Sequence, residues 1–162
     1  MGIAFIKDIP QVRGKRVTVM GLGLFGGGVG VVRYLAAQGA KVTVTDQQDA
    51  VHLRESVEAI RDIDVSLHLG GHDERDFRET DLLVVSPAIP EASPHLQQAV
   101  KNGIPLESEM NLFFKLCRGK TIGITGSNGK TTTTALIGEI LAKSGTATFV
   151  GGNIGRSLLE SV

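Results

Sequence analysis

Two glycine-rich loops, each between an apolar run and a helical pattern, constrain this chain more than any other feature. The first loop covers residues 21–26 and follows the run 16–20; the second covers residues 126–131 and follows the run 121–124. A strand that ends in a glycine loop and continues into a helix presents backbone N–H groups at the positive end of that helix. The sequence therefore predicts two phosphate-binding units in one chain.

The pattern around the first loop predicts an α/β fold, a Rossmann-like, doubly wound parallel sheet. Apolar runs alternate with helical patterns, and the run 81–85 is continuous, as expected of a strand that is buried on both faces. Strands are expected at 16–20, 41–45, 65–69, 81–85 and 104–106, and helices at 26–38, 51–60, 93–102 and 108–116.

The second loop predicts that another domain begins near the C-terminal end of the chain. Residues 118–120, which read Arg-Gly-Lys, are a plausible boundary. We expect residues 1–118 to form the first domain and residues 119–162 to be the truncated beginning of a P-loop domain, with strands at 121–124 and 147–150 and a helix around 135–141.

Composition narrows the class of protein. The 162 residues contain 17 basic and 17 acidic side chains, so a net charge of zero gives no reason to expect a nucleic acid or an anionic membrane as partner. No apolar stretch is as long as a membrane-spanning helix, and the first residues lack the apolar core of a secretory signal. Cys117 is the single cysteine, which excludes an internal disulfide. We expect a soluble cytoplasmic protein.

The second loop has the side chains that an ATP site needs. Its glycines allow backbone N–H groups to close around phosphate oxygens, Lys130 can place a positive charge between the β- and γ-phosphates, and the Thr131 hydroxyl can bind Mg²⁺. The common pattern has an additional glycine where this chain has Ile124, so the loop is a compact form. The predicted nucleotide-binding residues are Gly126, Ser127, Asn128, Gly129, Lys130, Thr131 and Thr132.

The first loop is open to two interpretations. It is a complete Gly-x-Gly-x-x-Gly, and Asp46 follows the second strand about 20 residues later, the spacing at which an acid contacts the ribose of NAD. A nucleotide-sugar fits this loop equally well, because any phosphate can bind a helix N-terminus and any ribose or base edge can meet the acid. Residues 86–90, Ser-Pro-Ala-Ile-Pro, follow the fourth strand and are expected at the same edge of the sheet.

Taken in order, the motifs resemble one family. They read Gly-Leu-Gly-Leu-Phe-Gly, Val-Thr-Asp, Ser-Pro-Ala-Ile-Pro, Gly-Ile-Thr-Gly-Ser-Asn-Gly-Lys-Thr-Thr and Gly-Gly-Asn-Ile-Gly. This series resembles the Mur ligases of peptidoglycan synthesis over residues 16–156, and within them the members that add D-glutamate. Three positions depart from the usual pattern: Ser127 replaces threonine, Ala88 replaces glycine, and Phe25 stands where a small or hydroxylated residue is common.

The resemblance implies a role for individual residues. The first domain would bind UDP-N-acetylmuramoyl-L-alanine instead of NAD. In the first loop, Leu24 and Phe25 would lie near the diphosphate, and after the second strand Asp46 and Gln47 would face the uracil. After the fourth strand, Ser86, Pro87 and Ala88 would line the uridine pocket. From the second domain, Asn153 would contact the sugar diphosphate.

The resemblance also implies a reaction. ATP would phosphorylate the substrate carboxylate, and the amine of D-glutamate would attack the acyl phosphate to form an amide. ATP and Mg²⁺ would be the cofactors, with Thr131 on the metal and Lys130 as the catalytic residue that neutralises charge on the transferred phosphoryl group. The family needs further catalytic residues and a D-glutamate site that do not occur here, so the chain is expected to be an inactive fragment of a ligase.

Three alternatives remain open at the level of sequence. An NAD(P)-dependent oxidoreductase would explain residues 21–26 and Asp46, but it leaves Lys130 and Thr131 unused. A non-enzymatic nucleotide-binding module would use both loops without turnover. A related Mur-type ligase could use another amino acid, because the selecting domain is not within this sequence.

Overall fold

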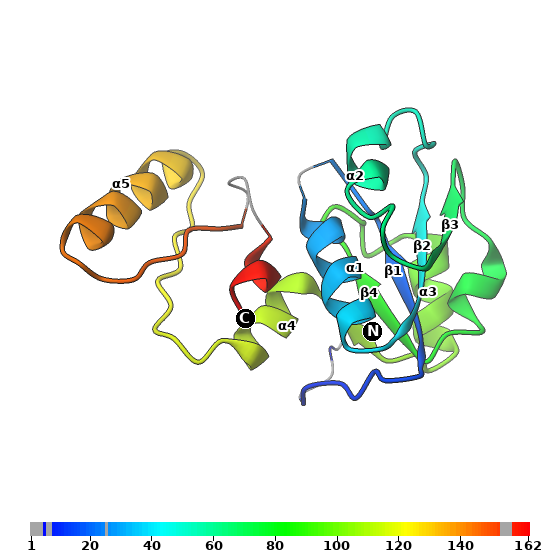
Figure 1. Cartoon of the computed structure of the whole chain (residues 1–162). Coiled ribbons are helices and arrows are strands. Elements are labelled where there is room, and N and C mark those ends of the chain that lie inside the picture. The colour runs from blue at the N-terminus through cyan, green and yellow to red at the C-terminus, as the bar shows by residue number, and fades with distance from the viewer. Residues whose placement is uncertain (1–4, 6–7, 25, 153–156) are drawn as a thin grey trace.

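The computed structural model describes residues 5, 8–24, 26–152 and 157–162, and its main body is a five-stranded parallel sheet (Figure 1). The strand order is β3-β2-β1-β4-β5, and every pair of neighbours is parallel. The strands are β1 Arg16–Met20, β2 Lys41–Asp46, β3 Val65–Leu69, β4 Leu82–Val85 and β5 Leu106–Glu107. The helices are α1 Gly27–Ala37, α2 Arg54–Glu58, α3 Pro94–Lys101, α4 Glu109–Leu116 and α5 Lys130–Lys143, with short 3-10 turns η1 Glu74–Phe77 and η2 Leu158–Ser161.

The central strands are buried on both faces because their alternate side chains enter two separate apolar clusters. Val17 and Val19 of β1 belong to the larger cluster, whereas Met20 belongs to the smaller one. Side chains of α1 and α4 fill the larger cluster, and those of η1 and α3 fill the smaller one. The expected doubly wound α/β fold is therefore confirmed for the first part of the chain.

The strand order creates a switch point beside β1. Strand β1 pairs with β2 on one side and with β4 on the other, so the loops that follow β1 and β4 leave the sheet toward opposite faces. In open α/β sheets a crevice forms at this place, outside the carboxyl ends of the strands. Residues 21–26 and 86–90 both begin there.

All five strands expected in the first part of the chain are present, with small shifts at their ends. The helix expected at 51–60 is shorter, because only Arg54–Glu58 is regular and turns flank it. The prediction of two strands beyond residue 118 was wrong, because neither 121–124 nor 147–150 is a strand. A strand exists only where a neighbour accepts its hydrogen bonds, and among the described residues neither segment has one.

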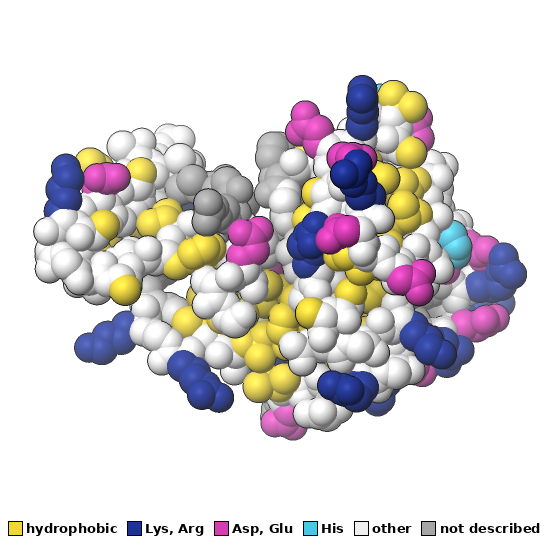
Figure 2. Space-filling model, in the orientation of Figure 1, with side chains coloured by type: hydrophobic (Ala, Val, Ile, Leu, Met, Phe, Trp, Pro, Cys, Tyr) yellow, Lys and Arg dark blue, Asp and Glu magenta, His cyan; other side chains and the backbone are white. Residues whose placement is uncertain are grey.

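Residues 119–152, which we call the arm, extend away from the sheet and carry α5 (Figure 1). Large apolar side chains of the arm remain exposed: Ile122 at 61%, Leu136 at 58% and Ile140 at 65%. Figure 2 shows hydrophobic side chains on the arm and in the region between the arm and the main body. The arm packs partly on itself, since a Cβ placed on Gly138 would lie 2.5 Å from Val150 Cγ2.

The chain then returns to the main body. Residues 157–162 pack against α1 and α4, and Leu159 is 4% exposed within the larger apolar cluster. In the part of the chain that the structure describes, no helix combines the length and the apolar character that crossing a membrane requires.

Candidate functional site

Asp46 holds together two loops at the carboxyl edge of the sheet. Its Oδ2 accepts hydrogen bonds from the backbone N–H groups of Leu22 at 2.9 Å and Gly23 at 3.2 Å. Its Oδ1 accepts from the N–H of Gln48 at 2.9 Å. The residue is only 9% exposed, so these charge-assisted bonds fix the first glycine loop to the end of β2. A contact of Asp46 with a base stays a prediction.

The loop after β4 lies directly against the first glycine loop. The N–H of Ser86 donates to Met20 O at 2.9 Å, which extends the β1–β4 ladder by one bond. Gly21 has φ 93°, and a Cβ on it would lie only 2.7 Å from Ser86 Cβ. Glycine is required at residue 21 for both reasons, and the two loops therefore form one continuous surface.

Helix α1 begins at this surface without a side-chain cap. Gly26 at its N-cap has φ 85°, no side chain among the described residues caps the helix, and its own first turn contains no acid. A Cβ on Gly28 would lie 2.2 Å from Leu22 O, so the glycine lets the helix start close to the loop. The first turn thus presents backbone N–H groups and a positive partial charge to an anion.

The residues expected to bind a nucleotide-sugar come from three loops at this edge. Leu24 is 51% exposed after β1, Gln47 is exposed after β2, and Ser86 is half-buried ahead of exposed Pro87 and Ala88. Phe25 and Asn153 lie outside the described residues. The structure thus places these five predicted residues in loops that leave the same edge of the sheet as Asp46.

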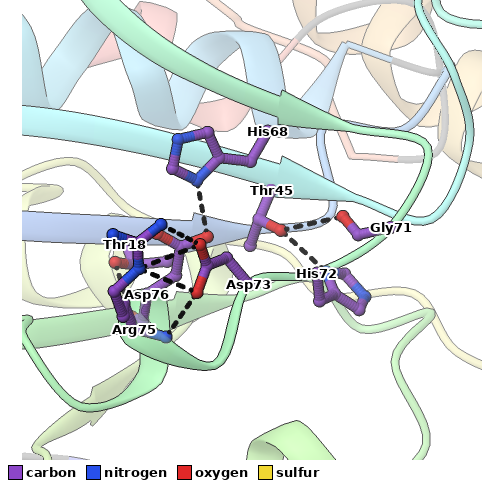
Figure 3. Close-up of polar contacts among 8 residues, drawn as sticks. All are labelled: Thr18, Thr45, His68, Gly71, His72, Asp73, Arg75 and Asp76. Carbon is purple, nitrogen blue, oxygen red and sulfur yellow. Dashed lines mark hydrogen bonds and ion pairs between the residues drawn. The ribbon is translucent and has the colours of Figure 1, made fainter.

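Beside this edge lies a polar network, a group of neighbouring contacts made by β2, β3 and η1 (Figure 3). His72 Nδ1 lies 2.7 Å from Thr45 Oγ1, and His68 Nδ1 lies 2.7 Å from Asp76 Oδ2. Burial, and then the nearby His95, lower the pKa of His72, whose buried Nε2 has no hydrogen-bond partner among the described residues. A shallow pocket of about 670 Å³ adjoins the network, lined by His68, Leu69, Gly70, Gly71, His72, Asp73, Glu74, Arg75 and Arg78.

The second glycine loop leads directly into α5 and lies on the exposed arm. Gly126 and Gly129 have φ 147° and 77°, and Gly129 is the N-cap of α5. Lys130 Nζ donates to Gly126 O at 2.5 Å and lies 3.4 Å from Ser127 O, so the side chain folds back over the loop. The side chains of Asn128, Thr131 and Thr132 are exposed.

One contributor to the site escaped the sequence analysis. Ser56, which is 4% exposed, donates its hydroxyl to Gly23 O at 2.6 Å and supports the first loop from α2. A single serine in an expected helix carries no signal of this role, because the contact spans the fold. Within the described ranges, no group of three or more His, Cys, Asp or Glu side chains could hold a metal ion.

Comparisons with known proteins agree with this arrangement. A UDP-N-acetylmuramoylalanine–D-glutamate ligase from Roseiflexus sp. is 46% identical over 152 residues, which cover 94% of this chain and 33% of the relative. The corresponding ligase from Koribacter versatilis is 49% identical over 150 residues, 93% of this chain and 33% of the relative. The chain thus spans about a third of the length of these curated relatives.

Solved structures agree at the level of the fold. A UDP-N-acetylmuramate:L-alanyl-γ-D-glutamyl-meso-diaminopimelate ligase from Neisseria meningitides matches with a TM-score of 0.59 and 22% identity, over 89% of this chain and 46% of that one. A pseudomurein peptide ligase type C from Methanothermus fervidus matches with a TM-score of 0.53 and 29% identity, over 82% of this chain and 27% of that one.

The family itself follows from a model that covers more than half of the chain. Residues 15–108 match the N-terminal domain of MurD-like Mur ligases, and these residues contain β1 to β5 and every described loop of the sheet edge. With curated relatives above 40% identity along nearly the whole sequence, the chain belongs to the MurD-like Mur ligases.

Proposed function

We propose that the sheet edge binds the uridine diphosphate part of UDP-N-acetylmuramoyl-L-alanine. The observation that carries this proposal is the surface formed by the loops after β1, β2 and β4, which Asp46 and Ser86 join at the uncapped start of α1. An anion is favoured there by the helix dipole and its N–H groups. Family membership favours the nucleotide-sugar over NAD and so supports this proposal.

We further propose that residues 1–118 are the nucleotide-sugar domain and that residues 119–162 begin the ATP-binding domain. The glycine loop supports this second assignment, because Lys130 already lies over it and α5 has neither a side-chain cap nor an acid in its first turn. ATP phosphates would replace the carbonyl partners of Lys130, and the hydroxyl of Thr131 would bind Mg²⁺.

In the whole protein the reaction would be ATP-dependent formation of an amide with D-glutamate, in the cytoplasm, as a step of peptidoglycan synthesis. ATP supplies the phosphoryl group that activates the substrate carboxylate. The residues of this chain would hold the uridine diphosphate at α1, and Lys130 would neutralise charge on the γ-phosphate. The remaining catalytic groups and the D-glutamate site would lie in the other two-thirds of the relatives' length.

Calorimetric titration tests the nucleotide-sugar site directly. We expect UDP-N-acetylmuramoyl-L-alanine and UDP to bind the chain more tightly than NADH. Ala88→Trp should abolish this binding, because the large side chain would occupy the proposed site at the sheet edge. Ala147→Trp makes the same change at an exposed alanine of the arm and should leave binding intact. Tighter binding of NADH that Ala88→Trp removes would instead support an oxidoreductase.

Two further measurements test the ATP domain. The chain alone should release no phosphate from ATP in the presence of both substrates, and turnover that persists after repurification would contradict the proposed division. In the full-length ligase, Lys130→Ala should lower kcat by at least about 100-fold, the scale for losing one group that stabilises transition-state charge. Lys120→Ala, an exposed lysine of the same arm, is the matched control.

A further inference from the structure

Glycines beyond the loop motif meet neighbours that the nucleotide site does not explain. A Cβ on Gly27 would lie 2.5 Å from Glu109 Oε2. A Cβ on Gly30 would lie 1.9 Å from Ser157 Oγ and 2.1 Å from Ser157 Cβ. Neither glycine has a positive φ, so both are required for close approach and not for backbone conformation. The start of α1 is therefore shaped to receive residues from α4 and from the C-terminal segment.

Glu109 connects these two contacts through one carboxylate. It is the first residue of α4, and its Oε1 accepts from the Ser157 hydroxyl at 2.6 Å and from the N–H of Leu158 at 3.1 Å. Its other oxygen, Oε2, is the atom that faces Gly27 in the first turn of α1. The carboxylate thus bridges residues 157–162 and the positive end of the helix.

Residues 157–162 are held to the main body by both burial and hydrogen bonds. Ser157 is 2% exposed, and its Oγ also accepts from the N–H of Leu159 at 3.2 Å, which caps η2. Leu159 is 4% exposed in the larger apolar cluster. In Figure 1 the red η2 lies beside α4. Hydrogen bonds and apolar burial therefore act together at a segment that is distant from α1 in sequence.

The charge of Glu109 matters as well as its hydrogen bonds. The first turn of α1 contains no acid of its own, so the carboxylate from α4 is a negative group that complements this helix end from another element. A phosphate group bound at the same end, as the proposed function requires, would meet a like charge. Binding should then be weaker than the bare helix end would allow.

We propose that Glu109 is a positioning residue that latches residues 157–162 onto the start of α1, and that its charge moderates the affinity of that helix end for uridine diphosphate. The latch does not depend on the proposed function, whereas the effect on affinity rests on it. In the sequence, residues 157–162 follow Asn153, which the resemblance assigns to the sugar diphosphate.

Amide hydrogen exchange of the ligand-free chain tests the latch. Glu109→Ala and Ser157→Ala should each speed exchange at Leu158 and Leu159 by at least about tenfold. The reason is that Glu109 Oε1 accepts from Leu158 N–H, while Ser157 Oγ, which is bonded to Glu109, accepts from Leu159 N–H. Glu109→Gln keeps an acceptor oxygen and should retain most of the protection. Glu139→Gln, the same change on exposed α5, is the control. Unchanged exchange in both alanine variants would overturn the latch.

Titration with UDP at low salt tests the charge. Glu109→Gln should tighten binding by about two- to fivefold, the range for one charge at a helix end, and Glu139→Gln should not change it. Unchanged or weaker binding in Glu109→Gln would overturn the effect on affinity. If the unmodified chain binds no UDP, the proposed function and the affinity effect fall together, while hydrogen exchange still decides the latch.

Discussion

Helices α1 and α5 both follow a glycine loop, yet only α1 is built into a core. Leu35 of α1 is 0% exposed, whereas Leu136 of α5 is 58% exposed. The strand before α1 pairs with neighbours on both sides, but the segment before α5 is not a strand at all. The difference teaches that this local pattern specifies a loop and a helix, while a sheet and a core require partners from elsewhere in the chain.

The largest expected contrast is in hydrogen exchange of the two regions. Amides of β1 and β4 should exchange at least about 100-fold more slowly than those of α5, because the arm buries little apolar surface and opens locally. The measurement needs a monomeric sample, since association of the exposed apolar arm would protect it. Equal protection in such a sample would show that the arm packs as firmly as the sheet.

A matched pair of leucines measures the same contrast as stability. Leu35→Ala should lower the free energy of unfolding by about 2–5 kcal/mol, the cost of a cavity in a core. Leu136→Ala should change it by less than about 0.5 kcal/mol, as is usual at an exposed position. Urea unfolding followed by circular dichroism gives both values, and a comparable loss for the two variants would break the comparison.

A second pair compares the polar groups that shape the two loops. Asp46→Ala should cost about 1–3 kcal/mol, because it leaves the buried N–H of Leu22 without its acceptor. Lys130→Ala should not change stability, since its bonds to the second loop are exposed. Thermal unfolding distinguishes them. A destabilisation by Lys130→Ala as large as that by Asp46→Ala would mean that the second loop is also held by its side chain.

The smallest effect concerns pH and the network beside the first loop. Because burial and His95 lower the pKa of folded His72, the unfolded chain takes up a proton first, and stability falls as pH drops below about 6.5. Asp46 and Asp76 oppose this shift without reversing it.

The slope from this single group cannot exceed about 1.4 kcal/mol per pH unit. His72→Gln should flatten the profile of unfolding free energy against pH near and below pH 6.5. A profile that His72→Gln leaves unaltered would contradict this assignment.

Local patterns predicted most of the first region and little of the second. Continuous apolar runs such as 81–85 indicate buried strands, and the spacing from Gly26 to Asp46 placed the acid at the correct edge of the sheet. The same reasoning failed at 121–124 and 147–150, because it assumed that an apolar run finds neighbours. Strand formation depends on hydrogen-bond partners that the run itself does not contain.

The sequence by itself determined the α/β class, the two glycine loops, the residues around the first loop and the family resemblance. Only the tertiary structure decided that the Asp46 carboxylate binds the loops, that Ser56 supports Gly23, and that Glu109 joins Ser157 to α1. Each of these contacts links residues from separate elements. Periodicity and motif spacing describe neighbours along the chain, whereas such contacts depend on how the strands order themselves in the sheet.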